Sequence, residues 1–361
     1  MQVAELILVG LSLFYGAAVL WIRAGLRRIP SERTLEQPMV SVIVAARNEE
    51  KHLPALLDAL AAQDYPRSCT EFIIVDDESE DATAALVEAY PDERFILLHS
   101  RNRNASASPK KQALDLGIKT ARGEILLLTD ADCLPPPNWL SDMVGYFTPD
   151  TGMVIGFSPA ELPLKKGFFP CLMQLDSLSL AAIAAGSSGW NAAATCNGRN
   201  LAYRKSVYQQ VGGFTRIQRH RSGDDDLLLG LVQTTEWKIR YAFDARVVVP
   251  TYRPQNFRHF VRQRLRHASK GFYYSPVKVA ALIAAYGYHF ILFTAPFLCG
   301  WMPFFFAMIF KLVVDFYLLH RFAVPMRRTE CLRILPLAEL LHVPYVVLFG
   351  AAGPFLSSKW K

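Results

Sequence analysis

The sequence lacks the short motifs that mark several common classes of protein. Its six cysteines form no C-x-x-C pair and have no histidine at the spacing of a zinc ligand, so we predict reduced thiols rather than a zinc site or a disulfide framework. No G-x-x-x-x-G-K-[ST] occurs in the chain, and no G-x-G-x-x-G follows the first predicted strand. These absences argue against a P-loop NTPase and against a dinucleotide dehydrogenase.

Charged residues are nearly absent from two long stretches near the ends of the chain. Residues 3–22 carry one charge, Glu5, and are about long enough to cross a bilayer. Residues 279–310 contain no Asp, Glu, Lys or Arg, and a single helix over them would span roughly 48 Å, more than the ~30 Å hydrocarbon core. We therefore expect a helical hairpin that turns at residues 299–303. A further apolar segment, residues 335–356, completes four predicted spans.

Basic residues flank these apolar segments and predict their orientation. Arg23, Arg27, Arg28 and Arg33 follow the first span, and the linker of residues 320–333 is also basic. By the positive-inside rule both lie in the cytoplasm, which leaves both termini outside. The net charge of +7 is concentrated beside the spans, which favours anionic lipid headgroups over nucleic acid as the partner. We predict a multi-pass protein of the inner (plasma) membrane with a cytoplasmic catalytic domain.

The soluble part, residues 38–275, alternates between predicted strands and helices. Four short apolar runs have the composition of strands, namely residues 39–46, 71–77, 94–100 and 124–132. Strand starts about thirty residues apart, with an amphipathic helix between the first two, predict βαβ units and a mostly parallel, Rossmann-like sheet. The chain then consists of an N-terminal transmembrane anchor (1–24), this α/β domain (38–275) and a C-terminal transmembrane region (276–361).

Polar side chains follow three of the predicted strands at their carboxyl ends. They are, in chain order, Arg47, Asn48, Glu49, Asp76, Asp77, Asp130 and Asp132. Ligands of parallel α/β sheets bind beyond the carboxyl ends of the strands, so we expect these side chains to share one edge. The arrangement is typical of a nucleotide-binding half-sheet.

Asp130 and Asp132, separated by one alanine, point to metal chemistry. On an extended backbone both carboxylates can reach one hard divalent cation, and Mg²⁺ or Mn²⁺ can then bridge a diphosphate. A turn capped by an acid is the plainer interpretation of an isolated D-x-D. Here the motif follows a buried strand of a nucleotide-type sheet, and this context favours the metal site.

Six segments in order, between residue 38 and about residue 271, resemble the motifs of the family 2 glycosyltransferases, which have a GT-A fold. They are VSVIVAARNEE, IIVDDESEDAT, SPKKQALDLGIKTARGEILLLTDADC, CNGRNLAYRKSVYQQVGGF, SGDDDLLL and QRLRH. Two positions depart from the family pattern, since Asp115 stands where Asn is more usual and His267 where Trp is usual.

The resemblance implies donor-side roles for the residues at the sheet edge. Glu49 and one of Asp76 and Asp77 would hold the uridine of a nucleotide donor, in the loop that begins with Arg47 and Asn48. Lys111 would steady the donor. Asp132 would ligate the metal on the diphosphate, with Asp130 nearer the sugar or the ribose.

The resemblance also implies the groups that act during transfer. The two acids of the family motif can be placed on Asp224 and Asp225, which makes Asp225 the general base. They can also be shifted by one residue, so that Asp224 is the base and Asp226 the later acid. Gln263 and Arg266 would lie over the diphosphate and stabilise the charge of the leaving group.

These patterns predict an inverting, metal-dependent glycosyltransferase that moves a sugar from a nucleotide donor, UDP-linked by the resemblance, to a membrane lipid or other apolar acceptor. His267 removes the flat apolar wall of polymerising enzymes and disfavours a polysaccharide synthase, the alternative enzyme. A membrane scaffold that keeps the fold without catalysis is the alternative outside enzymes, and the complete set of acids argues against it.

Two further segments keep open interpretations. Residues 161–190 predict a helix that either lies at the membrane surface or packs in the soluble core, with Asp176 a weak candidate for the site. Lys311 and Asp315 are four residues apart in the third predicted span, so they share a helix face and can pair within the membrane.

Overall fold

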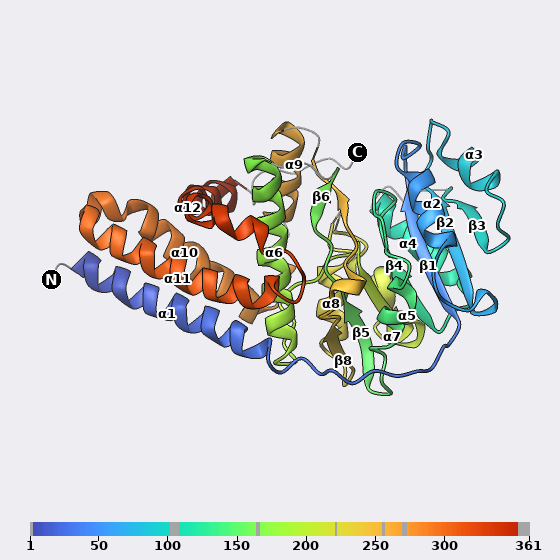
Figure 1. Cartoon of the computed structure of the whole chain (residues 1–361), viewed down its shortest axis with the longest axis horizontal. Helices are drawn as coiled ribbons and strands as arrows, with labels where there is room; N and C mark the ends of the chain where they lie inside the picture. The colour runs from blue at the N-terminus through green and yellow to red at the C-terminus, as the bar shows by residue number, and fades with distance from the viewer. Residues whose placement is uncertain are drawn as a thin grey trace. The chain divides into compact units, whose positions relative to one another are not determined.

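The computed structural model describes residues 3–101, 108–163, 167–220, 222–254, 257–268 and 273–352. The chain divides into two compact units, each described here by itself (Figure 1). The helical unit comprises Met1–Arg28, Leu164–Ser187 and Arg253–Lys361, and the α/β unit comprises Ile29–Pro163 and Ser188–Tyr252. Residues 164–187 and 253–275, which the predicted boundaries place in the catalytic domain, therefore group with the helices.

The α/β unit is built on a mostly parallel sheet. Its strands, with the short pair β6 and β9, are β1 (Val40–Ala46), β2 (Thr70–Asp76), β3 (Phe95–His99), β4 (Ile125–Leu128), β5 (Thr151–Ile155), β6 (Ala160–Leu162), β7 (Leu201–Arg204), β8 (Lys238–Tyr241) and β9 (Thr251–Tyr252). Seven of them form one sheet in the order β3-β2-β1-β4-β7-β5-β8, in which β1 to β4 run parallel and β7 is antiparallel to both neighbours. The predicted Rossmann-like α/β class is confirmed.

The helices fall into the same two units. Those of the α/β unit are α2 (Leu53–Ala61), α3 (Thr83–Glu88), α4 (Pro109–Thr120), α5 (Trp139–Val144), α7 (Lys205–Gln210) and α8 (Asp226–Val232). Those of the helical unit are α1 (Val3–Gly25), α6 (Phe168–Ser188), α9 (Phe257–Ala268), α10 (Pro276–Leu298), α11 (Trp301–Ala323) and α12 (Leu335–Ala352).

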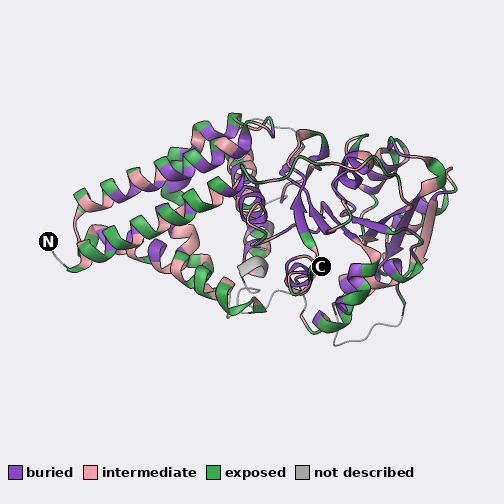
Figure 2. Ribbon diagram, turned by 90° about the horizontal axis from the view of Figure 1, so that it is seen from below, coloured by how far each residue is buried: buried purple, intermediate pink, exposed green. Residues whose placement is uncertain are grey.

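The alternation of side chains along β1 decides which helix covers each face of the sheet. Val40, Val42 and Val44 join the buried leucines of α2 in one core cluster. Ile43 faces the other side, where α4 crosses the strands and presents Gly117. A Cβ on that glycine would lie 2.7 Å from Ile43 Cγ2, so only glycine lets α4 approach this closely. Figure 2 shows the strands as the most buried part of the unit.

Five helices among the described residues are long and apolar enough to cross a membrane. Four of them, α1, α10, α11 and the segment that ends in α12, correspond to the predicted spans. The predicted hairpin turn is confirmed, because α10 ends at Leu298, α11 begins at Trp301, and Gly300 between them has a φ of +86°. The fifth is α6, which lies within the predicted segment 161–190.

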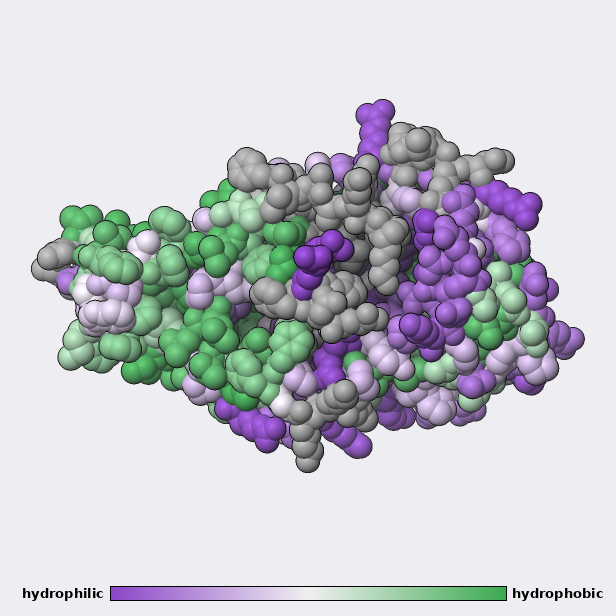
Figure 3. Space-filling view, turned by 90° about the horizontal axis from the view of Figure 1, so that it is seen from above, coloured by the Kyte–Doolittle hydropathy of each residue, from purple (hydrophilic) through white to green (hydrophobic). Residues whose placement is uncertain are grey.

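The outer surface of the helical unit is apolar. Large side chains such as Phe14 of α1, Ile283 of α10 and Phe306 of α11 are exposed. Figure 3 shows hydrophobic residues over these helices and hydrophilic residues over the α/β unit. Such a surface is stable when acyl chains surround it, which agrees with membrane-spanning helices.

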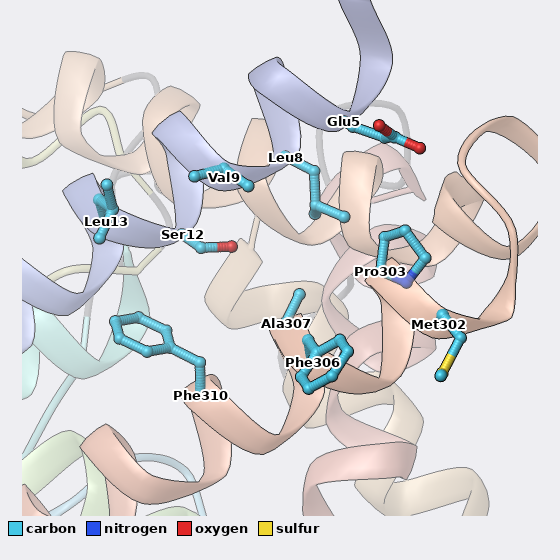
Figure 4. A pocket seen from close by; sticks show the side chains of 10 residues that line it. All are labelled: Glu5, Leu8, Val9, Ser12, Leu13, Met302, Pro303, Phe306, Ala307 and Phe310. Atoms are coloured by element: carbon cyan, nitrogen blue, oxygen red, sulfur yellow. The ribbon is translucent and has the colours of Figure 1, made fainter. Parts of the chain in front are cut away.

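Helices α1 and α11 pack closely along part of their length and separate toward their first turns. At the close approach, a Cβ on Gly16 would lie 2.5 Å from the ring of Phe310. Toward the first turns the two helices leave a groove of about 420 Å³, lined by apolar side chains apart from Glu5 and Ser12 (Figure 4). Acyl chains of the bilayer match this lining.

Candidate active site

The loops that follow β1 and β2 are tied together by hydrogen bonds. Asn48 has a φ of 54°, a left-handed conformation that asparagine tolerates, and its N–H donates to Ser79 Oγ at 3.0 Å. Its side-chain oxygen accepts from Glu80 N at 2.8 Å. Glu49 Oε2 lies 2.9 Å from His52 Nδ1. The polar residues after β1 therefore form a fixed wall at the carboxyl edge of the sheet, beginning with the half-buried Arg47.

Asp76 and Asp77 complete that wall at the end of β2. Asp76 is paired in register with Ala46, and Asp77 N donates to the carbonyl of Ala46 at 2.8 Å. Both carboxylates are nearly buried. Asp76 accepts from Ser79 N at 3.3 Å and lies 3.4 Å from His99 Nδ1. The predicted donor-side residues of β1 and β2 thus lie next to one another.

The D-x-D lies in a turn, not on the extended backbone that the sequence predicted. β4 ends at Leu128, and Cys133 N donates to the carbonyl of Asp130 at 3.1 Å, which closes the turn. The carbonyl of Asp132 accepts from Tyr252 N at 3.3 Å and from Thr251 Oγ1 at 3.2 Å. The turn is therefore held by β9, and both acids still lie at the carboxyl edge of the sheet.

Lys110 of α4 joins the D-x-D to the acids before α8. Its Nζ lies 2.7 Å from Asp130 Oδ1 and 3.1 Å from Asp224 Oδ2. Burial alone would lower the pKa of Lys110, but the two carboxylates outweigh it and raise that pKa above its usual range. The same ammonium lowers the pKa of Asp130, against the effect of burial. Lys110 therefore bridges Asp130 and Asp224.

Lys111, the residue predicted to steady the donor, is turned away from these acids. Its Nζ donates to the carbonyls of Ile217, His220 and Ser222 at 2.9, 2.8 and 3.0 Å. The side chain is 1% exposed. Burial and the nearby charge of Lys111 lower the pKa of His220. Lys111 therefore holds the segment that leads to the acids, and the adjacent Lys110 occupies the place in the site that was predicted for Lys111.

We expect replacement of Lys111 to lower mainly the stability of the protein and replacement of Lys110 to lower mainly its activity. Lys111→Met leaves three buried or half-buried carbonyls without their donor and should lower the free energy of unfolding by about 3 kcal/mol. Lys110→Met leaves two partly exposed carboxylates without their shared cation, so it should lower the melting temperature less than Lys111→Met does, and it should lower kcat/KM for the donor by about 10²-fold. Melting curves and initial rates on the two purified variants check this. Equal loss of stability in both would contradict the assignment.

The three consecutive acids at the start of α8, Asp224 to Asp226, have different surroundings. Asp225 is the N-cap of α8, with Oδ1 accepting from Asp226 N at 2.7 Å and Oδ2 from Gly198 N at 3.3 Å. Asp226 is buried, and its Oδ1 accepts from Thr195 Oγ1 at 2.8 Å and from Cys196 N at 3.0 Å. Asp226 therefore holds the 195–196 segment, while Asp224 and Asp225 border the site beside Gly198.

Two residues of the CNGRN segment were not predicted as part of the site or its frame. Asn200 is fully buried; its Nδ2 donates to the carbonyls of Phe157 and Val247, and its Oδ1 accepts from Trp139 Nε1. Arg199 Nε donates to Asn197 Oδ1 at 3.1 Å, and its positive charge opposes the rise that burial and Asp130 cause in the pKa of Asp132. The signal in the sequence was that both residues lie in a segment that resembles a family motif.

The Q-x-x-R residues belong to α9 of the helical unit. Gln263 Oε1 is buried without a hydrogen-bond partner among the described residues. Next to it, Arg264 is buried and pairs with Asp176 of α6 at 2.8 Å. The side chains of Arg266 and His267 lie outside the described residues. Their predicted roles over the diphosphate stay predictions.

The D-x-D turn offers the ligand chemistry that a hard divalent cation prefers. Asp130 and Asp132 supply carboxylate oxygens, and burial together with the charge of Asp130 raises the pKa of Asp132. A cation would relieve that repulsion. No group of three or more His, Cys, Asp or Glu side chains in the described parts of the chain could hold a metal ion. The two acids fit a metal that takes its other ligands from water and a bound diphosphate.

The thiol beside this turn shows no sign of metal or redox chemistry. Burial raises the pKa of Cys133 to about 12, so the group is a neutral thiol. All six cysteines are free of disulfides, as predicted.

Comparison with known proteins supports the fold and finds a family that part of the chain resembles. Residues 41–212 match the model of glycosyl transferase family 2. A probable glycosyltransferase of Bacillus subtilis, YdaM, is 28% identical over 248 residues, which cover 67% of this chain and 58% of the relative. The beta-monoglucosyldiacylglycerol synthase of Synechocystis is 32% identical over 118 residues, 33% of this chain and 25% of the relative. The chain thus spans less than two thirds of the length of these relatives.

A solved structure is similar over nearly the whole chain. The mannosyltransferase PcManGT from Pyrobaculum calidifontis, in complex with GDP-Man and Mn²⁺, superposes with a TM-score of 0.62 at 20% identity, covering 95% of this chain and 99% of that one. This likeness supports the GT-A arrangement of the parallel sheet. The α/β unit thus has a GT-A fold, and residues 41–212, which carry the ordered motifs and the acids at the carboxyl edge of the sheet, are similar to glycosyl transferase family 2.

Proposed function

We propose that the protein transfers a sugar from a nucleoside diphosphate donor, UDP-linked, to a membrane lipid or another apolar acceptor, with inversion at the anomeric carbon. The observation that carries the proposal is the bridge from the D-x-D to the acids before α8, in which Lys110 contacts both Asp130 and Asp224. It brings the predicted donor side and the predicted base side of the reaction to one edge of the sheet.

The donor side comprises the walls after β1 and β2. Carboxylates can accept hydrogen bonds from the N–H of uracil and the hydroxyls of ribose, which are the roles proposed for Glu49, Asp76 and Asp77. Arg47 and Asn48 complete this wall. Lys110, in place of Lys111, provides the positive charge for the diphosphate. Asp132, with Asp130, would hold Mg²⁺ or Mn²⁺, which when bound stabilises negative charge on the departing phosphates.

Asp225 is the proposed general base. It takes the proton of the acceptor hydroxyl as that oxygen forms its bond to the anomeric carbon and the bond from that carbon to the phosphate oxygen breaks. The two backbone N–H groups that donate to its carboxylate fix the position of Asp225 at the start of α8. Asp224 is held by Lys110 and positions the neighbouring Asp225. Attack opposite the leaving group accounts for inversion.

A lipid acceptor is supported by the membrane helices that flank the catalytic residues in the chain. Helices α1 and α10 to α12 lie on either side of the α/β unit in sequence, and α6 interrupts it with a further apolar helix. One relative has a name that describes synthesis of a glucosyl diacylglycerol. We place the protein in the inner (plasma) membrane, with the α/β unit in the cytoplasm, on the basic residues that follow α1.

Release of nucleoside diphosphate tests the proposal. The full chain in lipid nanodiscs is supplied with UDP- and GDP-sugars, Mn²⁺ or Mg²⁺, and extracted host lipids, and products are separated by mass. We expect release from a UDP-sugar that requires lipid and gives a glycosylated lipid. Release to water alone would remove the lipid acceptor, and no release from folded protein with any donor would favour a non-catalytic scaffold.

A further inference from the structure

A cluster of charged side chains lies inside the helical unit, where the proposed transfer reaction has no use for it. Lys311 and Asp315 of α11 meet Tyr15 of α1 and both Glu339 and His342 of α12. Lys311 is fully buried, and Asp315 and Glu339 are 8% and 6% exposed. The pair predicted from the four-residue spacing is therefore present, with a second carboxylate added. Charges within membrane-spanning helices are costly and mark functional sites.

The ammonium of Lys311 is the centre of the cluster. Its Nζ lies 2.7 Å from Asp315 Oδ2, contacts Glu339 Oε2, and lies 3.5 Å from His342 Nδ1. An ammonium has three N–H donors and no acceptor, so these partners use all three protons and Nδ1 of His342 must present a lone pair. An imidazolium would instead point a proton at the ammonium. The geometry thus makes His342 neutral.

His289 of α10 is neutral by a similar argument. Its Nδ1 lies 2.7 Å from the carbonyl of Ala285, so Nδ1 carries the proton. Its Nε2 is buried and has no partner among the described residues. A second proton there would create a buried cation without an acceptor. The rings of His289 and His342 meet edge to face, with centroids 5.1 Å apart, and Tyr288 stacks on Tyr15.

Two carboxyl groups therefore face one positive charge, and they are not equivalent. The hydroxyl of Tyr15 lies 2.7 and 2.9 Å from the two oxygens of Asp315, whose Oδ2 also accepts from Lys311. Glu339 accepts from Lys311, and the nearest nitrogen of the neutral His342 is 4.0 Å from the same oxygen, too far for a hydrogen bond. Donors thus stabilise the anionic form at Asp315 more than at Glu339. If both acids were ionised, the cluster would keep an uncompensated negative charge in an apolar bundle.

We propose that this cluster binds one proton, carried by the carboxyl group of Glu339, beside an ion pair between Lys311 and Asp315. The bound proton makes the cluster neutral at neutral pH. It also makes the membrane part of the protein a site where pH acts separately from the catalytic acids. The inference does not rest on the proposed transferase reaction, because all of its groups belong to the helical unit.

Infrared spectroscopy of the full chain tests this directly. The protein is placed in ether-linked lipid, whose chains add no ester carbonyl, and the C=O stretch of protonated carboxyl groups is recorded at neutral pH in H₂O and D₂O. We expect a deuterium-sensitive band that disappears in Glu339→Gln and persists in the control Glu5→Gln. No such band in the wild-type protein would mean that both acids are ionised, and a band that remains in Glu339→Gln would place the proton on another carboxyl group; either result would overturn the proposal.

Two further measurements keep the test independent of whether one variant folds. Carboxyl-¹³C glutamate incorporated into the wild-type protein should shift the band, and a band that does not shift would exclude glutamate. Glu339→Gln replaces a neutral group by a neutral one and should change the melting temperature by a few degrees at most. Asp315→Asn deprives Lys311 of its anion and should lower it by roughly 10 °C. Equal losses, or the reverse order, would contradict the assignment.

Discussion

Asp225→Asn is expected to reduce sugar transfer by roughly 10²- to 10⁴-fold while the fold stays intact. Asparagine cannot accept the proton of the acceptor hydroxyl at neutral pH. It remains a good N-cap, so its side-chain oxygen can keep the bond from Asp226 N that begins α8, while the longer bond from Gly198 N to Oδ2 is lost because an amide NH₂ does not accept. Melting curves therefore separate the loss of chemistry from any loss of stability. Initial rates with a saturating donor, together with melting curves of both proteins, provide the measurement.

The neighbouring acids supply matched controls for this variant. Asp226→Asn changes a buried carboxylate that accepts from Thr195 and Cys196, and should lower the melting temperature more than Asp225→Asn does. Asp224→Asn weakens the bridge to Lys110 and should reduce the rate less than Asp225→Asn. If Asp224→Asn were the more damaging change, the alternative placement of the family motif, with Asp224 as the base, would be correct.

The backbone frame of the site could be predicted from the sequence because it follows from the period of apolar residues. The runs that became β1 to β4 are short and apolar, and the leucines of α2 repeat at helical spacing. The charge-free stretch of residues 279–310 exceeds a bilayer, which forced the turn found at Gly300. In each case burial of apolar surface is a local property of the chain.

The contacts of individual polar side chains could not be predicted in this way. Lys110 and Lys111 are adjacent and chemically identical, and only the direction of α4 over the sheet decides which one reaches Asp130. The three consecutive acids at the start of α8 likewise have different hydrogen-bond partners, which only the fold decides. The prediction of an extended backbone at the D-x-D was wrong. β4 ends at Leu128, and β9 holds the turn that follows through contacts distant in sequence.

The antiparallel strand β7 shows a further limit of local patterns. Its residues Leu201–Arg204 were seen only as part of a motif, yet the strand lies between β4 and β5 in the sheet. Asn200, immediately before it, holds the segment that follows β5 and the segment at Val247 through its amide. The CNGRN segment thus places Gly198 next to Asp225, and this position requires the pairing of β7 with β4.

Removal of divalent cations is expected to abolish sugar transfer, by roughly 10³-fold or more, with recovery on addition of Mn²⁺ or Mg²⁺. The pair Asp130 and Asp132 concentrates negative charge at a buried turn, and a donor diphosphate would bring more. Lys110 and Arg199 offset part of that charge, but two fixed cations do not provide the oxygen-coordinated centre that joins carboxylate to phosphate. Rates after dialysis against EDTA, then against each metal, provide the measurement.

Asp132→Asn should raise the Mn²⁺ concentration needed for half-maximal activity by at least about 10-fold, because it removes a charged ligand and leaves the shape of the turn. Asp115→Asn is the matched control. Asp115 of α4 pairs with Lys119 and accepts from Tyr208 of α7, so the same chemical change there should leave metal activation unaltered. Binding of Mn²⁺, followed by its electron paramagnetic resonance signal in the presence of donor, separates affinity from rate. Full activity in EDTA, or an unchanged Mn²⁺ requirement in Asp132→Asn, would show that Lys110 and its neighbours stabilise the leaving group without a metal at this turn.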